Sequence, residues 1–562
     1  MTKEVDRSSL DLPYTGTNIT RRALSLILIA AAIGVTPMLL FGYHLGHDLS
    51  FHVSSWMEAE QQFRQGNLFP SWAPGANYGF GDARFIFYPP ISWVTGAALG
   101  SILPWKMVPG TYVFLAFVLA GVAMWKLAIE WLAPPNALLA SVLYALSPYS
   151  MVTAYTRCAY GELMAGALLP LLGWAALRMA RDPRRAVIPL AVVFAAIWLA
   201  NLPAAVIASY SLACLLLLDC LVSWSLRPLW FGAAAILAGF GVAAFTLLPA
   251  ALERKWTNAA LISNYKPWND FLFARRSTPL IQNFHVKLSF MALILIGITL
   301  IAAFFARGLR QNTPEVWWPL TALGAVAAFL MSPLSRIVWQ TLPELRFVQL
   351  PWRWLFPLCM AGAFLTASAV PEAGRKWISW LALILVVGAI YGRIAHWDSF
   401  SFKDALAAVR SGAGYGGTRE YAPFGIIVGN LPKDAPQIAL AKGLDEKDSS
   451  SRPCADFHVD LWTPERKVIY VNSPESLSVN LKLLAYPSWR VKVNGIAVNL
   501  EADENTGQVR LRLPAGKSRT EIAFVRTWDR TAGIAISFAS VIAIVAGGIF
   551  VRREGVSQNA EA

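Results

Sequence analysis

An acidic residue and a histidine stand one helical turn apart just after the first strongly apolar run of the chain. Asp48 lies about six residues beyond that run, and His52 follows four residues later on the same face of a helix expected over 49–65. A carboxylate in this place can accept a proton from an acceptor hydroxyl, and the pair could bind a divalent cation. The alternatives are a solvated or helix-capping Asp48 and an interfacial His52.

Aromatic side chains crowd the segment 43–90, which holds these two residues. Trp72 and Tyr88 are candidates for shaping a sugar pocket by stacking, but aromatic residues also anchor proteins at membrane interfaces. Glu58 and Glu60 are expected on the solvated face of the amphipathic helix. Two prolines end the segment and restrict the path of the chain as it returns to apolar sequence.

Two charged residues flank a short loop between apolar runs further along the chain. Arg157 and Glu162 stand so close to expected membrane spans that their charges are costly unless they are paired or functional. The sequence leaves two interpretations open. One is an ion pair with each other or with another loop, and the other is a catalytic role in positioning the first loop.

Basic residues gather in two segments, 251–288 and 333–354, which the alternation of spans places on the outer side. That placement opposes the tendency of Lys and Arg to lie on the cytoplasmic side. Because Arg binds phosphate oxygens in a bidentate fork, a lipid-linked phosphate is one expected partner, and anionic headgroups of membrane lipids are the alternative. The sequence has no P-loop and no dinucleotide-binding glycine pattern, so a nucleotide donor is not expected. The candidate substrate-binding residues in these segments are Arg254, Lys255, Arg275, Arg276, Arg346, Gln349 and Arg353.

The elements that must position these residues are mostly membrane helices. Of the 562 residues, 56% are apolar and 15% are charged, whereas soluble domains carry about 25% charged residues. The formal net charge of +14 is typical of loops that face anionic lipid, and no nucleic-acid partner is expected. A cleavable signal is not expected either, because the first apolar run is long enough to span a membrane and no small-residue cleavage site follows it.

The apolar runs predict an all-α polytopic membrane protein with about 12 transmembrane helices and cytoplasmic termini. Clusters of Lys and Arg fall on the cytoplasmic side of this arrangement. The run 86–104 opens with Pro89-Pro90 and contains glycines, so it is interpreted as a juxtamembrane or re-entrant segment. The expected spans are 23–42, 108–129, 136–153, 163–179, 186–200, 204–223, 229–250, 289–306, 317–332, 355–370, 377–394 and 532–551.

A C-terminal extracytoplasmic β-rich domain is expected over 396–530, before the last helix. It is predicted to be β-sandwich-like from about 460, after a flexible connection over 432–456. Asn494-Gly495 predicts a hairpin through a type I′ turn. The expected strands are 468–472, 477–484, 489–493, 508–513 and 520–526. The other expected parts are a cytoplasmic tail over 1–22, a transmembrane module over 23–395, and the last helix with its tail over 531–562.

Several short motifs, in a specific order, resemble those of a bacterial membrane family described as "pyruvoyl-tetrahydropterin synthase-related" and of the YfhO-like membrane proteins, which belong with the GT-C glycosyltransferases. The resemblance covers nearly the whole chain. The motifs are Asp48-x-x-x-His52, Gly66 to Trp72, Gly79-Phe80-Gly81, Phe87 to Pro90, Arg157 to Glu162, Leu342 to Arg353, Tyr486 to Gly495 and Leu513 to Lys517.

This resemblance implies a GT-C-like fold and an inverting sugar transfer on the outer face of the bacterial cytoplasmic (inner) membrane. The donor would be a polyprenyl-phosphate sugar and the acceptor an envelope glycan, lipid or protein. Asp48 would be the base. Where the relatives often show His-Asn near the end of a middle span, this chain has Ala200-Asn201, which puts a role at that site in doubt. Metal dependence varies among GT-C enzymes, so the resemblance does not decide whether the protein uses a divalent cation.

We therefore expect a glycosyltransferase of the cell envelope. Asp48 would deprotonate the acceptor, and the outer arginines would stabilise the leaving phosphate. The alternatives are a transporter or flippase for a lipid-linked glycan and a non-catalytic envelope-assembly protein. A flippase is expected to carry charge along its spans, whereas the middles of most expected spans here lack it.

Overall fold

The computed structural model describes residues 17–561, except for 44, 180, 277, 372–399 and 442–454. These residues form two compact units, each built from separated stretches of the chain. The first unit draws on Met1–His47, Gly110–Gly239 and Lys266–Phe400, and the second on Asp48–Pro109, Phe240–Tyr265 and Ser401–Ala562. The expected span 377–394 and most of the expected connection 432–456 lie outside the described residues.

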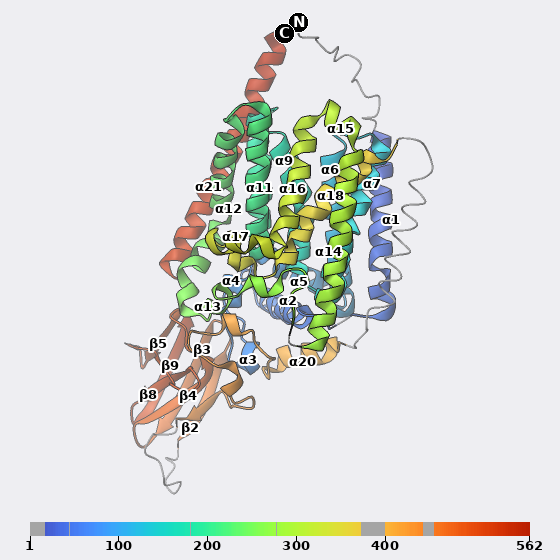
Figure 1. Cartoon of the computed structure of the whole chain (residues 1–562). Helices are drawn as coiled ribbons and strands as arrows, with labels where there is room; N and C mark the ends of the chain where they lie inside the picture. The colour runs from blue at the N-terminus through green and yellow to red at the C-terminus, as the bar shows by residue number, and fades with distance from the viewer. Residues whose placement is uncertain are drawn as a thin grey trace. The chain divides into compact units, whose positions relative to one another are not determined.

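The first unit consists of helices. Helices α14, α16 and α18 pack side by side (Figure 1). Helix α9 packs against α10, α11 and α18. The main helices are α1 (Thr17–Phe41), α6 (Val108–Ala128), α7 (Pro134–Ala145), α8 (Pro148–Met151), α9 (Tyr160–Leu177), α10 (Pro183–Ala200), α11 (Leu202–Ser223), α14 (Pro279–Phe305), α15 (Arg307–Asn312), α16 (Pro314–Leu330), α17 (Arg336–Thr341) and α18 (Leu355–Ala369). Helix α12 (Arg227–Glu253) begins in the first unit, and its residues from Phe240 onward belong to the second.

Local sequence explains how several of these helices begin. Proline occupies the first turn of α7, α10, α14 and α16, where its missing N–H costs nothing. Asn201 caps α11 by accepting a hydrogen bond from the backbone N of Ala204 at 3.0 Å. This cap gives Asn201 a structural role at the position where the family resemblance left its function in doubt.

Nine described helices are long and apolar enough to cross a membrane, and a tenth span is counted if α16 and α17 form one broken span. By length and composition this is the organisation of a multi-pass membrane protein. Helix α18 has only 15 residues, fewer than the roughly 20 that cross a bilayer. The expected number of twelve spans stays a prediction. Helix α5 (Pro90–Ile102), in the region expected to be juxtamembrane, has 13 residues.

The second unit combines the segment after Asp48 with a β region and the last helix. Its helices include α2 (Leu49–Arg64), α3 (Ala76–Gly79), α4 (Arg84–Phe87), α5, α13 (Ala260–Ser263), α20 (Phe402–Ser411) and α21 (Trp528–Glu561). Helix α2 packs against α5 and α20. The predicted helix over 49–65 is thus confirmed, but the prediction that Glu58 and Glu60 face solvent is wrong. Both are buried because these neighbours and the segment after α2 pack against the helix.

The β region contains a four-stranded and a five-stranded antiparallel sheet. Their strand orders are β1-β4-β8-β7 and β2-β3-β9-β5-β6. Val493 pairs with Ile496 across Asn494 and Gly495, both with positive φ, so the predicted hairpin turn is confirmed. The strands are β1 (Ile438–Leu440), β2 (Asp456–Trp462), β3 (Arg466–Ser473), β4 (Leu477–Leu484), β5 (Trp489–Val493), β6 (Ile496–Val498), β7 (Glu501–Ala502), β8 (Gln508–Leu513) and β9 (Gly516–Phe524). Each of the five predicted strands overlaps one of these.

Candidate functional site

Glu162 is the centre of a buried charge cluster in the first unit. Nη1 of Arg157 donates to both carboxylate oxygens of Glu162 at 2.7 Å, and Nε of Arg353 donates to Oε2 at 2.9 Å. The hydroxyl of Tyr149 donates to Oε1 at 2.7 Å. Of the two interpretations that the sequence left open, the ion pair between Arg157 and Glu162 is observed, and a catalytic role of the two residues stays a prediction. The pair also includes Arg353, which lies 191 residues from Glu162 in the sequence.

Irregular backbone brings these side chains together. Arg157 ends a π-helical turn, η3 (Val152–Arg157), and Cys158 adopts a left-handed conformation before α9 begins. Arg353 lies in a 3-10 turn, η8 (Pro351–Trp354), and its Nη1 donates to the backbone carbonyl of Val348 at 2.6 Å. Single π turns inside helical segments often occur at functional sites.

The Glu162 carboxylate contacts two guanidinium groups, and all three side chains are at least nine-tenths buried. Buried charges of this kind are stable only when they are paired and hydrogen-bonded. Among the described residues, no acceptor lies within hydrogen-bond distance of Nη2 of Arg353. This nitrogen is therefore available to an anion.

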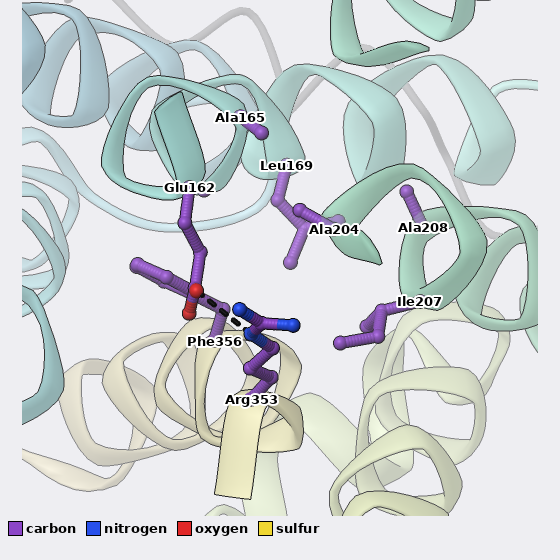
Figure 2. Close-up of a pocket in the computed structure, with 9 residues that line it drawn as sticks. Glu162, Ala165, Leu169, Ala204, Ile207, Ala208, Arg353 and Phe356 are labelled. Carbon is purple, nitrogen blue, oxygen red and sulfur yellow. Dashed lines mark hydrogen bonds and ion pairs between the residues drawn. The ribbon is translucent and has the colours of Figure 1, made fainter. Parts of the chain in front are cut away.

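A small pocket adjoins this guanidinium. Figure 2 shows Arg353 pointing toward Glu162, with Ala204 and Ile207 of α11 also lining the space. The pocket has room for about one water molecule. Apart from Arg353 and Glu162 its walls are apolar, so an anionic group entering it would meet these two charges in water-poor surroundings, where charge-assisted hydrogen bonds are strong. The lining residues are Glu162, Ala165, Gly166, Leu169, Ala204, Ile207, Ala208, Arg353 and Phe356.

Asp48 belongs to a second group of residues, in the second unit. It occupies the N-cap position of α2, but its side chain does not cap the helix, and it is half-buried. Its charge acts on Glu420, which lies in the 3-10 turn η9 (Arg419–Tyr421). Burial, together with the charges of Asp82 and Asp48, raises the pKa of the Glu420 carboxyl. Two acidic side chains thus lie at the start of α2, and sequence reasoning found only one of them.

Half-exposed aromatic rings adjoin this acidic pair. The ring of Phe51 lies edge-on to Tyr88 at 5.0 Å between centroids and stacks on Tyr421 at 6.0 Å. Such ring faces and edges can contact the apolar side of a sugar ring. The sequence-predicted Tyr88 belongs to this group, whereas Tyr421 was missed.

His52 and Trp72 lie in packed surroundings instead. His52 is buried with its Nδ1 3.2 Å from the hydroxyl of Ser92, and burial lowers its pKa to about 3. Trp72 is fully buried and packs against Tyr486 and Trp489. Both placements are typical of core residues. Among the described residues, no group of three or more His, Cys, Asp or Glu side chains could hold a metal ion.

The remaining predicted substrate-binding residues have different surroundings. Arg254, Lys255 and Arg275 are exposed. Arg276 forms an ion pair with Asp270 at 3.1 Å. Arg346 is exposed and lies over the ring of Trp268 at 5.6 Å. Gln349 has a positive φ of 65°, and its side chain lies 3.4 Å from Nη1 of Arg353.

A glycine-rich segment positions the residues that sequence reasoning missed. The backbone N of Tyr415 donates to Gly75 O at 2.9 Å, and the backbone N of Tyr78 donates to Tyr415 O at 2.8 Å. The segment 412–417 therefore pairs with the loop after α2 and delivers Glu420 and Tyr421 beside it. The repeated glycines between Gly412 and Gly417 were the available signal for such a close backbone approach.

No family model matches the chain. No curated protein matches it either. Among solved structures, the arabinofuranosyltransferase AftD from Mycobacteria aligns with a TM-score of 0.42 and 17% identity over 67% of this chain and 26% of that chain. The apo oligosaccharyltransferase from Archaeoglobus fulgidus aligns with a TM-score of 0.41 and 14% identity over 70% of this chain and 56% of that chain.

A second structure from Archaeoglobus fulgidus, the oligosaccharyltransferase AglB with an inhibitory peptide and a dolichol-phosphate, aligns with a TM-score of 0.34 and 13% identity, over 72% of this chain and 57% of that chain. The chain thus spans about a quarter of the AftD chain and just over half of the archaeal chains. These similar proteins are glycosyltransferases, but likeness this low does not by itself assign a fold or an activity. The resemblance to the YfhO-like family stays a prediction.

Proposed function

We propose that this protein transfers a sugar from a polyprenyl-phosphate donor to a cell-envelope acceptor. The observation that carries the proposal is the buried guanidinium of Arg353, which Glu162 holds in place and which lines a small pocket. A lipid phosphate is an anion that this guanidinium can bind. Glu162 holds both guanidinium groups in place, so the cluster is organised before the phosphate arrives.

The proposed reaction needs one base and one anion site. Asp48 removes the proton of the acceptor hydroxyl, whose oxygen forms a bond to the anomeric carbon opposite the phosphate. The bond from that carbon to the phosphate oxygen breaks, and its electron pair leaves with polyprenyl phosphate. Arg353 stabilises the growing negative charge on the phosphate, which lowers the barrier of the transfer step.

The acceptor is proposed to meet the group around the start of α2. Phe51, Tyr88 and Tyr421 offer ring surfaces next to Asp48, and the Glu420 carboxyl offers hydrogen bonds to further hydroxyls. The proposal also retains a bacterial cytoplasmic membrane location, with the segment 43–90 and the domain 396–530 on the outer face and both termini in the cytoplasm. Envelope glycans, lipids and proteins remain the acceptor classes.

Sugar transfer in proteoliposomes tests this function. Purified protein is given a panel of radiolabelled polyprenyl-phosphate sugars with cell-envelope extract as acceptor. The Asp48→Asn variant should fold normally and lose at least about 100-fold in transfer rate, because a general base contributes about 10²–10⁴-fold. Asp460→Asn, which changes an exposed aspartate of β2, is the matched control and should transfer at the wild-type rate.

The outcome separates the competing functions. Transfer by Asp48→Asn at the wild-type rate would remove Asp48 as the base. Saturable lipid binding by all three proteins, with no transfer from any donor, would favour a flippase or an assembly protein over an enzyme.

A further inference from the structure

Helix α17 turns sharply away from the helix before it. The axis of the segment Pro333–Thr341 makes an angle of 88° with α16. If α16 crosses the membrane, α17 runs along the membrane plane. Trp339 faces the interior, where its Nε1 donates to Leu330 O at 2.9 Å, while Leu334 and Ile337 are 82% and 71% exposed. Such a short helix with an apolar outer face is typical of a segment that lies in a membrane interface.

Two arginines share one aromatic ring beside this helix. The guanidinium of Arg336, at the start of α17, lies 5.2 Å from the ring centre of Trp268. The guanidinium of Arg346, in the 3-10 turn η7 (Leu345–Val348), lies 5.6 Å from the same ring. The indole thus contacts two exposed cations, and its ring attracts both of them.

No described carboxylate neutralises these two arginines. Asp270, at the end of the turn that carries Trp268, is paired with Arg276 at 3.1 Å. Glu344 lies two residues before Arg346, but no ion pair joins it to either arginine within the part of the chain that the structure describes. The guanidinium of Arg346 reaches only the backbone carbonyl of Gln340, at 3.4 Å. Both positive charges therefore remain available to external anions.

We propose that Arg336, Trp268 and Arg346 form a binding site for the phosphodiester headgroup of an anionic phospholipid. The two guanidinium groups bind phosphate oxygens, and the acyl chains lie over the exposed Leu334 and Ile337. This site is separate from the Arg353 cluster, and it does not depend on the proposed sugar transfer. Exposed apolar side chains beside the two cations favour a lipid over a free phosphate, which has no apolar part.

Native mass spectrometry of the full-length protein in detergent tests the site. The protein is titrated with phosphatidylglycerol, with zwitterionic phosphatidylcholine and with inorganic phosphate. The wild type should retain a phosphatidylglycerol molecule that the double variant Arg336→Ala, Arg346→Ala binds about 30-fold more weakly, since each basic residue at the site adds to the attraction. Phosphatidylcholine should not occupy the site.

A matched double variant controls for charge and for the loss of stacked arginines. Arg307 and Arg310 of α15 are also exposed, and they lie over separate rings, those of Phe304 and Trp317. Arg307→Ala, Arg310→Ala removes the same charge and should retain the lipid like the wild type. Thermal unfolding of all three proteins identifies a variant that has lost its fold.

Three outcomes would overturn the proposal. Wild type and both double variants, all folded, could retain phosphatidylglycerol equally, or both double variants could bind it more weakly than the wild type to the same extent. Inorganic phosphate could also displace the lipid at a comparable concentration. The first two would show that this trio is not the site. The third would show a phosphate site with no lipid preference.

Discussion

The guanidinium nitrogens of Arg353 have different surroundings. Its Nε contacts Glu162, its Nη1 contacts the carbonyl of Val348, and the residue lines the pocket. Because two of the three nitrogens are fixed by the protein, the third is held in place without further loss of side-chain freedom. A lysine in this position would keep the charge but could not make the same set of contacts.

We therefore expect Arg353→Lys to raise the KM for the lipid-linked donor about tenfold or more while changing kcat less. The lost hydrogen bonds involve a charged group, and each such bond contributes about 1.5–3 kcal/mol. Initial rates over a range of donor concentrations in proteoliposomes measure the effect. Arg307→Lys, at an exposed position, should leave the donor KM unchanged. An unchanged donor KM in folded Arg353→Lys would argue against donor binding at this cluster.

The carboxyl of Glu58 is a second buried ionisable group, and it makes the free energy of unfolding depend on pH. Burial raises the pKa of its carboxyl from 4.5 to about 7, although the nearby Arg84 opposes the shift. The folded protein thus binds this proton more tightly than the unfolded chain. Its contribution to the free energy of unfolding falls as the pH rises from 4.5 to about 7, and the loss is complete above that range.

Glu58→Gln should remove this dependence, because glutamine has no proton to lose. Relative to the wild type, the variant should gain about 3 kcal/mol in the free energy of unfolding between pH 4.5 and 7. Burial lowers the pKa of His52 to about 3, which has the opposite effect on stability between pH 3 and 6.5, but His52 is common to both proteins and cancels in the difference. Denaturant unfolding at a series of pH values measures the gain, and a constant difference would contradict it.

At the scale of elements, the pairing of 412–417 with the loop after α2 depends on backbone-to-backbone contact. Gly414 has a φ of +75°, and a Cβ there would overlap the backbone N of Gly79 and the carbonyl O of Gly75. Both strain and overlap therefore exclude larger residues. The same pairing positions Glu420 and Tyr421. A substitution that disrupts the pairing should therefore affect the residues around Asp48 as well as the stability of the protein.

Gly414→Ala should lower the free energy of unfolding by about 3 kcal/mol and reduce sugar transfer. Gly416 is the matched control in the same segment, since the nearest atom to a Cβ there is the Tyr78 hydroxyl at 3.8 Å. Gly416→Ala should change stability by less than about 1 kcal/mol. Denaturant unfolding compares the two variants, and equal stability would show that the close approach is unimportant.

The elements show what could be predicted from the sequence and what could not. Helix α2, the five strands and the Asn494-Gly495 turn follow from local periodicity and turn chemistry, and the pairing of Arg157 with Glu162 follows from the cost of charge near a membrane. The burial of Glu58 and the position of Glu420 depend on contacts between segments more than 300 residues apart. Local patterns carry no information about such contacts, so the surroundings of Asp48 could be predicted only in part.

At the scale of the whole molecule, one buried cluster ties distant parts of the second unit together. Glu253, at the end of α12, accepts hydrogen bonds from Arg530 of α21 at 2.7 and 2.8 Å and from the Tyr486 hydroxyl at 2.6 Å. Arg530 also donates to the Ser488 hydroxyl at 2.8 Å. The β region is thus joined to two helices by a charge pair with several satisfied hydrogen bonds.

Glu253→Ala should destabilise this junction by about 3–5 kcal/mol, because it leaves the Arg530 charge buried without its partner. Hydrogen exchange of β5 and β9 should become faster in the variant. Glu504→Ala, at an exposed position, should leave exchange as in the wild type. Unchanged exchange in the Glu253 variant would mean that the sheets alone hold this region together.

The pairing of Tyr415 with Gly75 also sets an order of events during biosynthesis. A ribosome that has just released the segment 43–90 must add more than 300 residues before the partner segment 412–417 exists. At about 5–20 residues per second, the early segment waits on the order of half a minute with Trp72 and its aromatic neighbours uncovered. The nascent chain therefore needs protection on that side of the membrane, and its maturation should be sensitive to chaperone supply and to pauses in translation.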